Sequence, residues 1–277
     1  MTWEETIAYI QNTPSFASLV RDTYIAADLP SNVERFRSSV EFKETQSVLQ
    51  RYIATPQPKL LDIGAGNGAA SISFALLGYQ VTALEPDKSM TVGSGAIKTV
   101  VEYYQLTNVQ VVEAVGEILP FDDESFDIVY VRQALHHASD LSVFVKEAGR
   151  VLKKQGIMLT LRDHVVTGQR DKKRFLARHP LHRYYGGENA FSLSAYQAAF
   201  KEAGLTILQQ ISPSASPINY DPWSKTQLIQ ILSAKFGQWI ATRPWLIEMA
   251  WRLSMIRKEY LPGKLYSFVV GKRSFDS

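Results

Sequence analysis

The stretch Leu60-Leu61-Asp62-Ile63-Gly64-Ala65-Gly66-Asn67-Gly68 decides the fold. An apolar run that ends in glycine is typical of a buried parallel strand, here residues 59–64. The glycines after it let the backbone approach a ligand, and the helix expected over 68–77 would turn its N-terminus toward negative groups. Gly64, Gly66 and Ala69 also satisfy the dinucleotide pattern G-x-G-x-x-G/A, so the loop alone leaves the ligand open, and a merely tight turn stays an alternative.

Strands and helices alternate on the C-terminal side of this loop. We expect strands over 80–86, 109–115, 126–131, 157–161, 205–211 and 265–270, and helices over 88–104, 141–152 and 194–203. This order predicts an α/β fold, a Rossmann-like doubly wound sheet of seven mainly parallel strands with an antiparallel edge strand. The last two strands are joined by a long excursion, which suits an antiparallel pair. Ligands of such sheets lie beyond the carboxyl ends of the strands.

The segments outside this alternation are expected to be helical additions. Residues 1–55 form an N-terminal helical cap that ends before Pro56 and Pro58, and residues 56–277 form the main domain. Two insertions, 163–192 and 222–262, interrupt the main domain.

Composition excludes several classes of protein. The 277 residues are 45% hydrophobic and carry a net charge of only +3, too small to mark a nucleic-acid binder. The absence of cysteine excludes disulfides and thiolate metal sites and fits a reducing compartment. The N-terminus lacks the features of a signal peptide, and no apolar run is long enough to span a membrane, so we predict a cytoplasmic protein.

Two acids sharpen the interpretation of the glycine loop. Glu85 lies 21 positions after Gly64, where a carboxylate can accept both hydroxyls of a ribose. Asp62 precedes the first glycine by two residues, where it would repel a pyrophosphate and attract an ammonium group. This pair favours a nucleoside that carries an amino acid. A carboxylate of Asp62 that only caps loop amides stays an alternative.

Four further segments accompany the glycine stretch and Glu85: Leu119-Pro120-Phe121, Phe126-Asp127-Ile128-Val129, Ala134-Leu135-His136-His137 and Arg150-Val151-Leu152-Lys153. With them, the chain resembles the class I S-adenosylmethionine-dependent methyltransferases with a methyltransferase type 11 domain, over about residues 59–165. It resembles most the small-molecule branch that includes ubiquinone and menaquinone biosynthesis methyltransferases. The resemblance implies S-adenosylmethionine as cofactor and a small-molecule methyl acceptor: a phenol, a quinol or a lipid-like compound.

The resemblance also implies where the cofactor binds. It places Asp62, Gly64 and Gly66 around the methionine part with Ala65 and Gly68 beside them, Glu85 and Pro86 at the ribose, Gly116 and Glu117 beside adenine, and Arg132 and Gln133 near the methionine part or the acceptor. The family often has an aspartate for the adenine amino group where this chain has Val115, so neighbouring backbone or Glu117 would take that role. An arginine paired on the surface is the alternative for Arg132.

All five histidines follow the fourth and fifth expected strands, on the ligand side of the sheet. Histidine can remove a proton as a hydroxyl or amine attacks the methyl group, and His164 is the first candidate for this base and His182 the second. The expected acceptor pocket, in and near the insertion 163–192, takes its polar and aromatic side chains from His137, Arg162, His179, Tyr184, Tyr185, Glu188 and Asn189. We expect no metal, although two histidines with Glu188 would make a reasonable ligand set. For His136 and His137 a capping or packing role is the simpler interpretation.

The insertion 222–262 is rich in tryptophan and basic residues, and residues 222–264 contain seven lysines and arginines against two glutamates. It suits a lid in transient contact with a membrane surface, or helices packed on the domain or on a second copy in a homodimer. Nucleic acid is not an expected partner. Two rival functions stay open: a nicotinamide-dependent oxidoreductase, and a non-catalytic scaffold that binds the cofactor.

Overall fold

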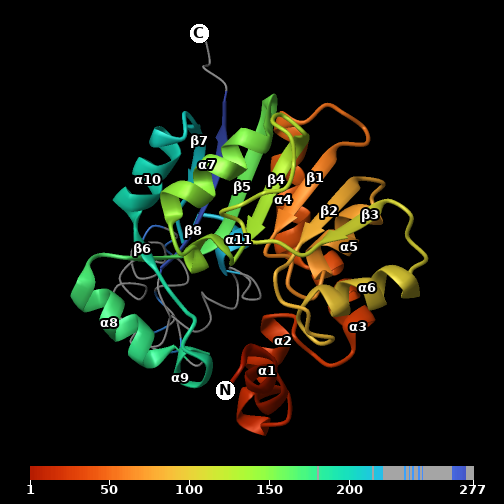
Figure 1. Cartoon of the computed structure of the whole chain (residues 1–277). Helices are drawn as coiled ribbons and strands as arrows, with labels where there is room; N and C mark the ends of the chain where they lie inside the picture. The colour runs from red at the N-terminus through yellow and green to blue at the C-terminus, as the bar shows by residue number, and fades with distance from the viewer. Residues whose placement is uncertain are drawn as a thin grey trace.

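The apolar run before the glycines forms β1 (Lys59–Ile63) in the middle of one sheet (Figure 1). The structure, a computed structural model, describes residues 1–179, 181–213, 215–220 and 264–272 and the single positions 234, 237, 239, 243 and 245. Within these residues the other strands are β2 (Gln80–Leu84), β3 (Val109–Val112), β4 (Phe126–Arg132), β5 (Leu152–Val166), β6 (Phe191–Ser192), β7 (Thr206–Ile211) and β8 (Lys264–Gly271).

The strands follow the order β3-β2-β1-β4-β5-β8-β7, and the two-residue β6 pairs with β5 outside this path. The strands β1 to β6 pair in parallel. Only β8 runs antiparallel, and it lies between β5 and β7 at one end of the described sheet. The α/β fold class is therefore confirmed, and so is the antiparallel pair formed by the last two strands.

Helices cover both faces of the sheet. The helices of the described residues are α1 (Trp3–Gln11), α2 (Ala17–Asp22), α3 (Leu29–Ser38), α4 (Val40–Tyr52), α5 (Ala69–Ala75), α6 (Ser94–Tyr103), α7 (Leu141–Val151), α8 (Gln169–Arg178), α9 (His182–Tyr185), α10 (Leu193–Glu202) and α11 (Pro217–Tyr220), with short 3-10 turns η1 (Pro14–Phe16) and η2 (Leu135–His137).

Successive residues of the buried strands belong to two hydrophobic cores, one on each face of the sheet. Leu61 and Val129 face α7 and α10, whereas Leu60 and Ile128 face α4, α5 and α11. Successive strand residues point to opposite faces, so a continuous apolar run is what a sheet covered on both sides requires. Burial of both faces fixes the sheet, and thereby the places where its strands end.

The helical additions meet at one end of the molecule. In Figure 1, α1 and α9 lie side by side below the sheet. The rings of Trp3 and Tyr185 are 4.9 Å apart, and those of Tyr9 and Tyr184 are 5.0 Å apart. The N-terminal helices and the insertion 163–192 are thus packed against each other, although some 180 residues separate them.

Some element boundaries differ from those expected. β5 is much longer than 157–161, since it runs to Val166 and pairs with both β8 and β6. The expected helix 88–104 begins only at Ser94, because the residues before it form turns in which Asp87 and Ser89 bind backbone amides. No helix among the described residues is long and apolar enough to cross a bilayer. The insertion 222–262 falls almost wholly outside the described residues.

Candidate functional site

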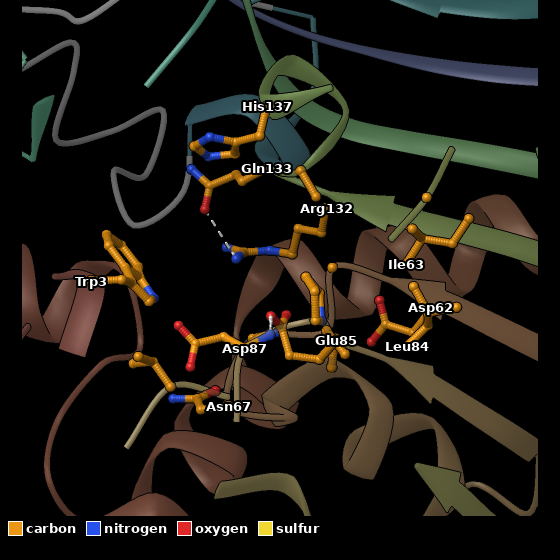
Figure 2. Close-up of a pocket in the computed structure, with 18 of the residues that line it drawn as sticks. Trp3, Asp62, Ile63, Asn67, Leu84, Glu85, Asp87, Arg132, Gln133 and His137 are labelled. Carbon is orange, nitrogen blue, oxygen red and sulfur yellow. Dashed lines mark hydrogen bonds between the residues drawn. The ribbon is translucent and has the colours of Figure 1, made fainter. Parts of the chain in front are cut away.

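A cavity of about 730 Å³ opens where β1, β2 and β4 end. Figure 2 shows Glu85 and Asp87 along one side of it and Arg132, Gln133 and His137 along the other, with Trp3 at one end. Ten of the eleven predicted cofactor residues line it: Asp62, Gly64, Ala65, Gly66, Glu85, Pro86, Gly116, Glu117, Arg132 and Gln133. Gly68 does not line it.

The glycine loop contains backbone conformations that residues with a side chain adopt only with strain. Gly64, Gly66 and Gly68 have φ values of +72°, +58° and +83°. A Cβ on Gly64 would lie 2.5 Å from the Cβ of Ala134, so this position allows no side chain. Gly68 precedes α5 and packs on Ile97, so its role is to start the helix.

Asp62 and Glu85 are nearly fully buried at the strand ends, 1% and 8% exposed. One oxygen of Asp62 accepts from the Ser71 hydroxyl at 2.6 Å, and burial raises the pKa of Asp62 to about 6. Glu85 accepts from the amides of Gly66 and Asp87 at 2.8 and 3.1 Å, and burial raises its pKa to about 7. Capping of a loop amide was the alternative role for Asp62, and Glu85 makes that bond instead.

The expected adenine side of the cavity is formed after β3. Gly116 lies against the ring of Phe144, where a Cβ would come within 2.1 Å of a ring carbon. Glu117 accepts from the Ser139 amide at 2.8 Å, and Val115 is exposed at the rim. The arrangement leaves a flat, partly apolar wall beside a carboxylate.

Arg132 is paired, but the pair is buried rather than on the surface. Its guanidinium donates to both oxygens of Glu41 at 2.6 and 2.9 Å, and Arg162 donates to the same carboxylate at 3.1 Å. Burial opposes the charge of Glu41, yet the two guanidiniums hold its pKa below the ordinary value. Arg132 also donates to the Gln133 side chain at 3.1 Å, a bond drawn in Figure 2. Glu41 of α4 thus orients one wall of the cavity.

The backbone is strained at this same wall. Gln133 and Arg162 have φ values of +51° and +60°, which side chains other than glycine seldom adopt. The pairing of β5 with β8 shifts its register between Thr160 and Asp163, around Arg162. Such strain persists only where the surroundings hold it, and it gathers at functional sites.

Three of the five histidines, His136, His164 and His179, gather behind the cavity wall. His136 bridges two carboxylates, with Nδ1 3.0 Å from Asp163 and Nε2 3.6 Å from Glu188. The rings of His164 and His179 stack edge-on nearby. His137 alone lines the cavity, and His182 begins α9, half-buried. His164 and His182, the expected bases, are not among the residues that line the cavity.

The expected acceptor residues do not lie together. His137 and Tyr185 line the cavity, whereas His179 and Glu188 are buried in the histidine cluster and Arg162 is bound to Glu41. Tyr184 packs on the rings of the N-terminal cap, and the side chain of Asn189 accepts from the adjacent amide of Ala190.

The N-terminal segment, residues 1–53, was expected to cover the pocket, but the residues through which it lines the cavity were not named from the sequence. Trp3, Tyr24 and Phe36 line it, and Asn67 of the glycine loop donates to the Tyr24 carbonyl at 2.7 Å. Glu41 was also missed, although it shares one helix face with Thr45 and Val48. An acid on a buried helix face was the signal that could have marked it.

Comparisons with known proteins identify methyltransferases as relatives of this chain. A family model described as a methyltransferase domain matches residues 61–160. The uncharacterized methyltransferase YcgJ of Bacillus subtilis is 32% identical over 197 residues, 70% of this chain and 76% of that protein. The ubiquinone biosynthesis O-methyltransferase of Bartonella quintana is 25% identical over 194 residues, 61% of this chain and 68% of that protein.

A solved structure shares the fold. Geranyl diphosphate C-methyltransferase from Streptomyces coelicolor, in complex with Mg²⁺, geranyl-S-thiolodiphosphate and S-adenosyl-L-homocysteine, has a TM-score of 0.58 at 14% identity, with 83% of this chain and 76% of that chain covered. At this identity the likeness concerns the fold.

Proposed function

Since this chain belongs to the S-adenosylmethionine-dependent methyltransferases, we propose that it transfers the cofactor's methyl group to a hydroxyl of a small aromatic acceptor, a phenol or a quinol. One observation carries the proposal: a single cavity joins the acids of the glycine loop to an end lined by aromatic rings and one histidine. Both reactants would therefore share one cavity, which alignment of nucleophile, methyl carbon and sulfur requires.

The glycine-loop end suits the cofactor. Asp62 offers a carboxylate for the ammonium group of the methionine part, and Glu85 offers two oxygens for the ribose hydroxyls. The bonds of Glu85 to the Gly66 and Asp87 amides hold that carboxylate in place before the ligand arrives. Gly116, Glu117 and Phe144 supply the wall for adenine.

The opposite end suits a flat, largely apolar acceptor. Trp3, Tyr24 and Tyr185 present rings to the cavity, and Arg132 and Gln133 add polar groups at its wall. Aromatic side chains bury much surface with fixed geometry, and they favour planar ligands. The ubiquinone methyltransferase from Bartonella quintana acts on an oxygen, according to its name, and supports this class of acceptor.

His137 takes the role of general base in this proposal. Its Nδ1 lies 3.1 Å from the Gly187 carbonyl. A carbonyl only accepts, so Nδ1 carries the proton and Nε2, which lies 3.8 Å from Glu188, carries the lone pair. Bound S-adenosylmethionine would supply the methyl group: the acceptor oxygen would attack the methyl carbon, the carbon–sulfur bond would break with its electron pair left on sulfur, and Nε2 of His137 would take the hydroxyl proton.

Calorimetric titration with S-adenosylmethionine, S-adenosylhomocysteine and NADH tests the cofactor. Micromolar binding of the first two alone supports the proposal, whereas binding of NADH alone would favour the oxidoreductase. Production of S-adenosylhomocysteine is then followed with phenols and quinols, and no turnover on any acceptor would favour a scaffold.

His137→Ala tests the base. We expect turnover of a neutral phenol to fall about 10²–10⁴-fold with the cofactor Kd unchanged. Turnover of an acceptor that is already a phenolate should fall much less, which separates proton removal from acceptor binding.

Cytoplasmic location, a homodimer and membrane contact through 222–262 remain predictions from the sequence.

A further inference from the structure

A buried cluster of imidazoles and carboxylates lies behind the cavity wall, outside the proposed transfer site. His136 follows β4, His164 belongs to β5, His179 follows α8, and Glu188 lies between α9 and β6. All four are at least nine-tenths buried, with exposed fractions of 2%, 6%, 7% and 7%. Four separate segments of the chain therefore bring titratable side chains together in one buried place.

Their spacing matches the coordination sphere of a small cation. Ligand atoms of His136, His164 and Glu188 all lie within 4.8 Å of one another, and Nε2 of His136 is 3.6 Å from Glu188. Nδ1 of His179 is 3.8 Å from the other oxygen of Glu188. Two nitrogens bound tetrahedrally to zinc are about 3.4 Å apart, so small side-chain movements would complete the sphere.

The orientation of His136 is that of a metal ligand. Its Nδ1 lies 3.0 Å from Asp163, and the same carboxylate oxygen accepts from the His136 amide at 3.1 Å. Metal-bound histidines almost always donate their second ring nitrogen to a carboxylate or carbonyl, which fixes the ring and its tautomer. Asp163 thus directs Nε2 toward Glu188.

The simpler alternative is a protonated His136 held between Asp163 and Glu188. The electrostatics are compatible with it: burial opposes the charge, but the two carboxylates raise the pKa of His136 to about 9. This ion pair, however, leaves Nδ1 of His164 and Nδ1 of His179 buried without a hydrogen-bond partner among the described residues. Such orphaned nitrogens are costly, and a cation would use both of them.

We propose that His136, His164, His179 and Glu188 bind a divalent transition metal, zinc in preference, in a closed four-coordinate site. Three imidazoles and one carboxylate are borderline ligands that suit zinc and not magnesium, which prefers oxygen ligands and retains water. Because the ligands come from the ends of β4 and β5 and from the insertion, the metal fastens the segment with α8 and α9 to the sheet. It would thereby hold Tyr185 and the Gly187 carbonyl at the cavity.

Metal binding by the full chain tests the proposal without an activity assay. After chelator treatment the protein is titrated with Zn²⁺, and with Co²⁺, whose visible absorption reports tetrahedral geometry; Mg²⁺ serves as the comparison ion. We expect one Zn²⁺ per chain with a Kd below about 1 µM, a rise in Tm of about 5 °C, and slower amide exchange over 182–190.

Glu188→Gln and His164→Gln remove one ligand each, and His182→Gln, at the start of α9, is the matched control outside the four proposed ligands. We expect the first two variants to bind Zn²⁺ at least tenfold more weakly and to lose the cobalt spectrum, while the control retains both. Circular dichroism shows whether each variant is folded. Absence of equimolar binding in the unmodified chain overturns the proposal, as does binding that survives both ligand substitutions or falls equally in the control.

Discussion

The two sides of the cavity are built in different ways. The glycine-loop side, from Asp62 to Glu85, comes from one stretch of chain in which backbone conformation and two carboxylates make the site. The β4–β5 side gathers Arg132, His136 and Arg162 against partners as distant as Glu41, 91 and 121 positions away. A site made within one βα turn can be predicted from spacing, whereas a site made by tertiary packing cannot.

This difference predicts where substitutions should act. Changes on the glycine-loop side should weaken ligand binding through local geometry, and changes on the β4–β5 side should first cost stability, since its charges balance one another away from water.

Glu41→Gln should have the largest effect. The variant leaves the guanidiniums of Arg132 and Arg162, 14% and 10% exposed, without their shared countercharge. Breaking a buried ion pair in this way costs about 3–5 kcal/mol. Urea unfolding followed by fluorescence measures the loss.

Asp123→Asn is the control for Glu41→Gln. It breaks an ion pair of similar length with Arg150, 2.8 Å, in which the carboxylate is 74% exposed. The expected loss is below about 1 kcal/mol. Equal losses in the two variants would contradict the view that burial makes the Glu41 cluster structural.

A comparison of Gly64→Ala with Gly66→Ala tests, on the glycine-loop side, whether the close approach of the backbone to Ala134 matters. Both glycines have positive φ, but only the first would place its Cβ 2.5 Å from Ala134, whereas nothing lies within 4 Å of the second. We expect a loss of about 2–4 kcal/mol for Gly64→Ala and about 1 kcal/mol for Gly66→Ala, measured by urea unfolding. Equal losses would show that φ alone matters and that the approach to Ala134 does not.

The same comparison explains what could be predicted from the sequence. Apolar runs and glycines report neighbours a few residues away, so the strands, their parallel order and the residues Asp62 and Glu85 at the strand ends could be placed. Trp3 reaches the cavity, and Glu41 reaches the cavity residue Arg132, through helix packing, and no local pattern encodes which helix covers which strand end. His164 was taken for the base because it follows the predicted end of a strand; β5 in fact continues to Val166 and pairs with β8 at His164, whose side chain is buried.

Glu85→Ala and Asp62→Ala should each weaken S-adenosylmethionine binding by about 1–3 kcal/mol, because each removes charge-assisted bonds in a buried place. Calorimetry gives the change in Kd. Glu113→Ala is a suitable control, since this acid follows β3 and pairs with Lys98 without lining the cavity. Near-native affinity in both test variants would contradict the assignment of the cofactor end.

The dependence of cofactor binding on pH should be about tenfold. Burial raises the pKa of Glu85 to about 7 and that of Asp62 to about 6. Raised carboxyl pKa values stabilise the free fold at low pH, and that stability is lost as pH rises to about 7. Cofactor affinity should run the opposite way, since the ionised forms bind the ribose hydroxyls and the ammonium group, so the Kd at pH 6 should be about tenfold above that at pH 8. In Glu85→Gln most of this dependence should vanish; a dependence that persists unchanged would assign it to another group.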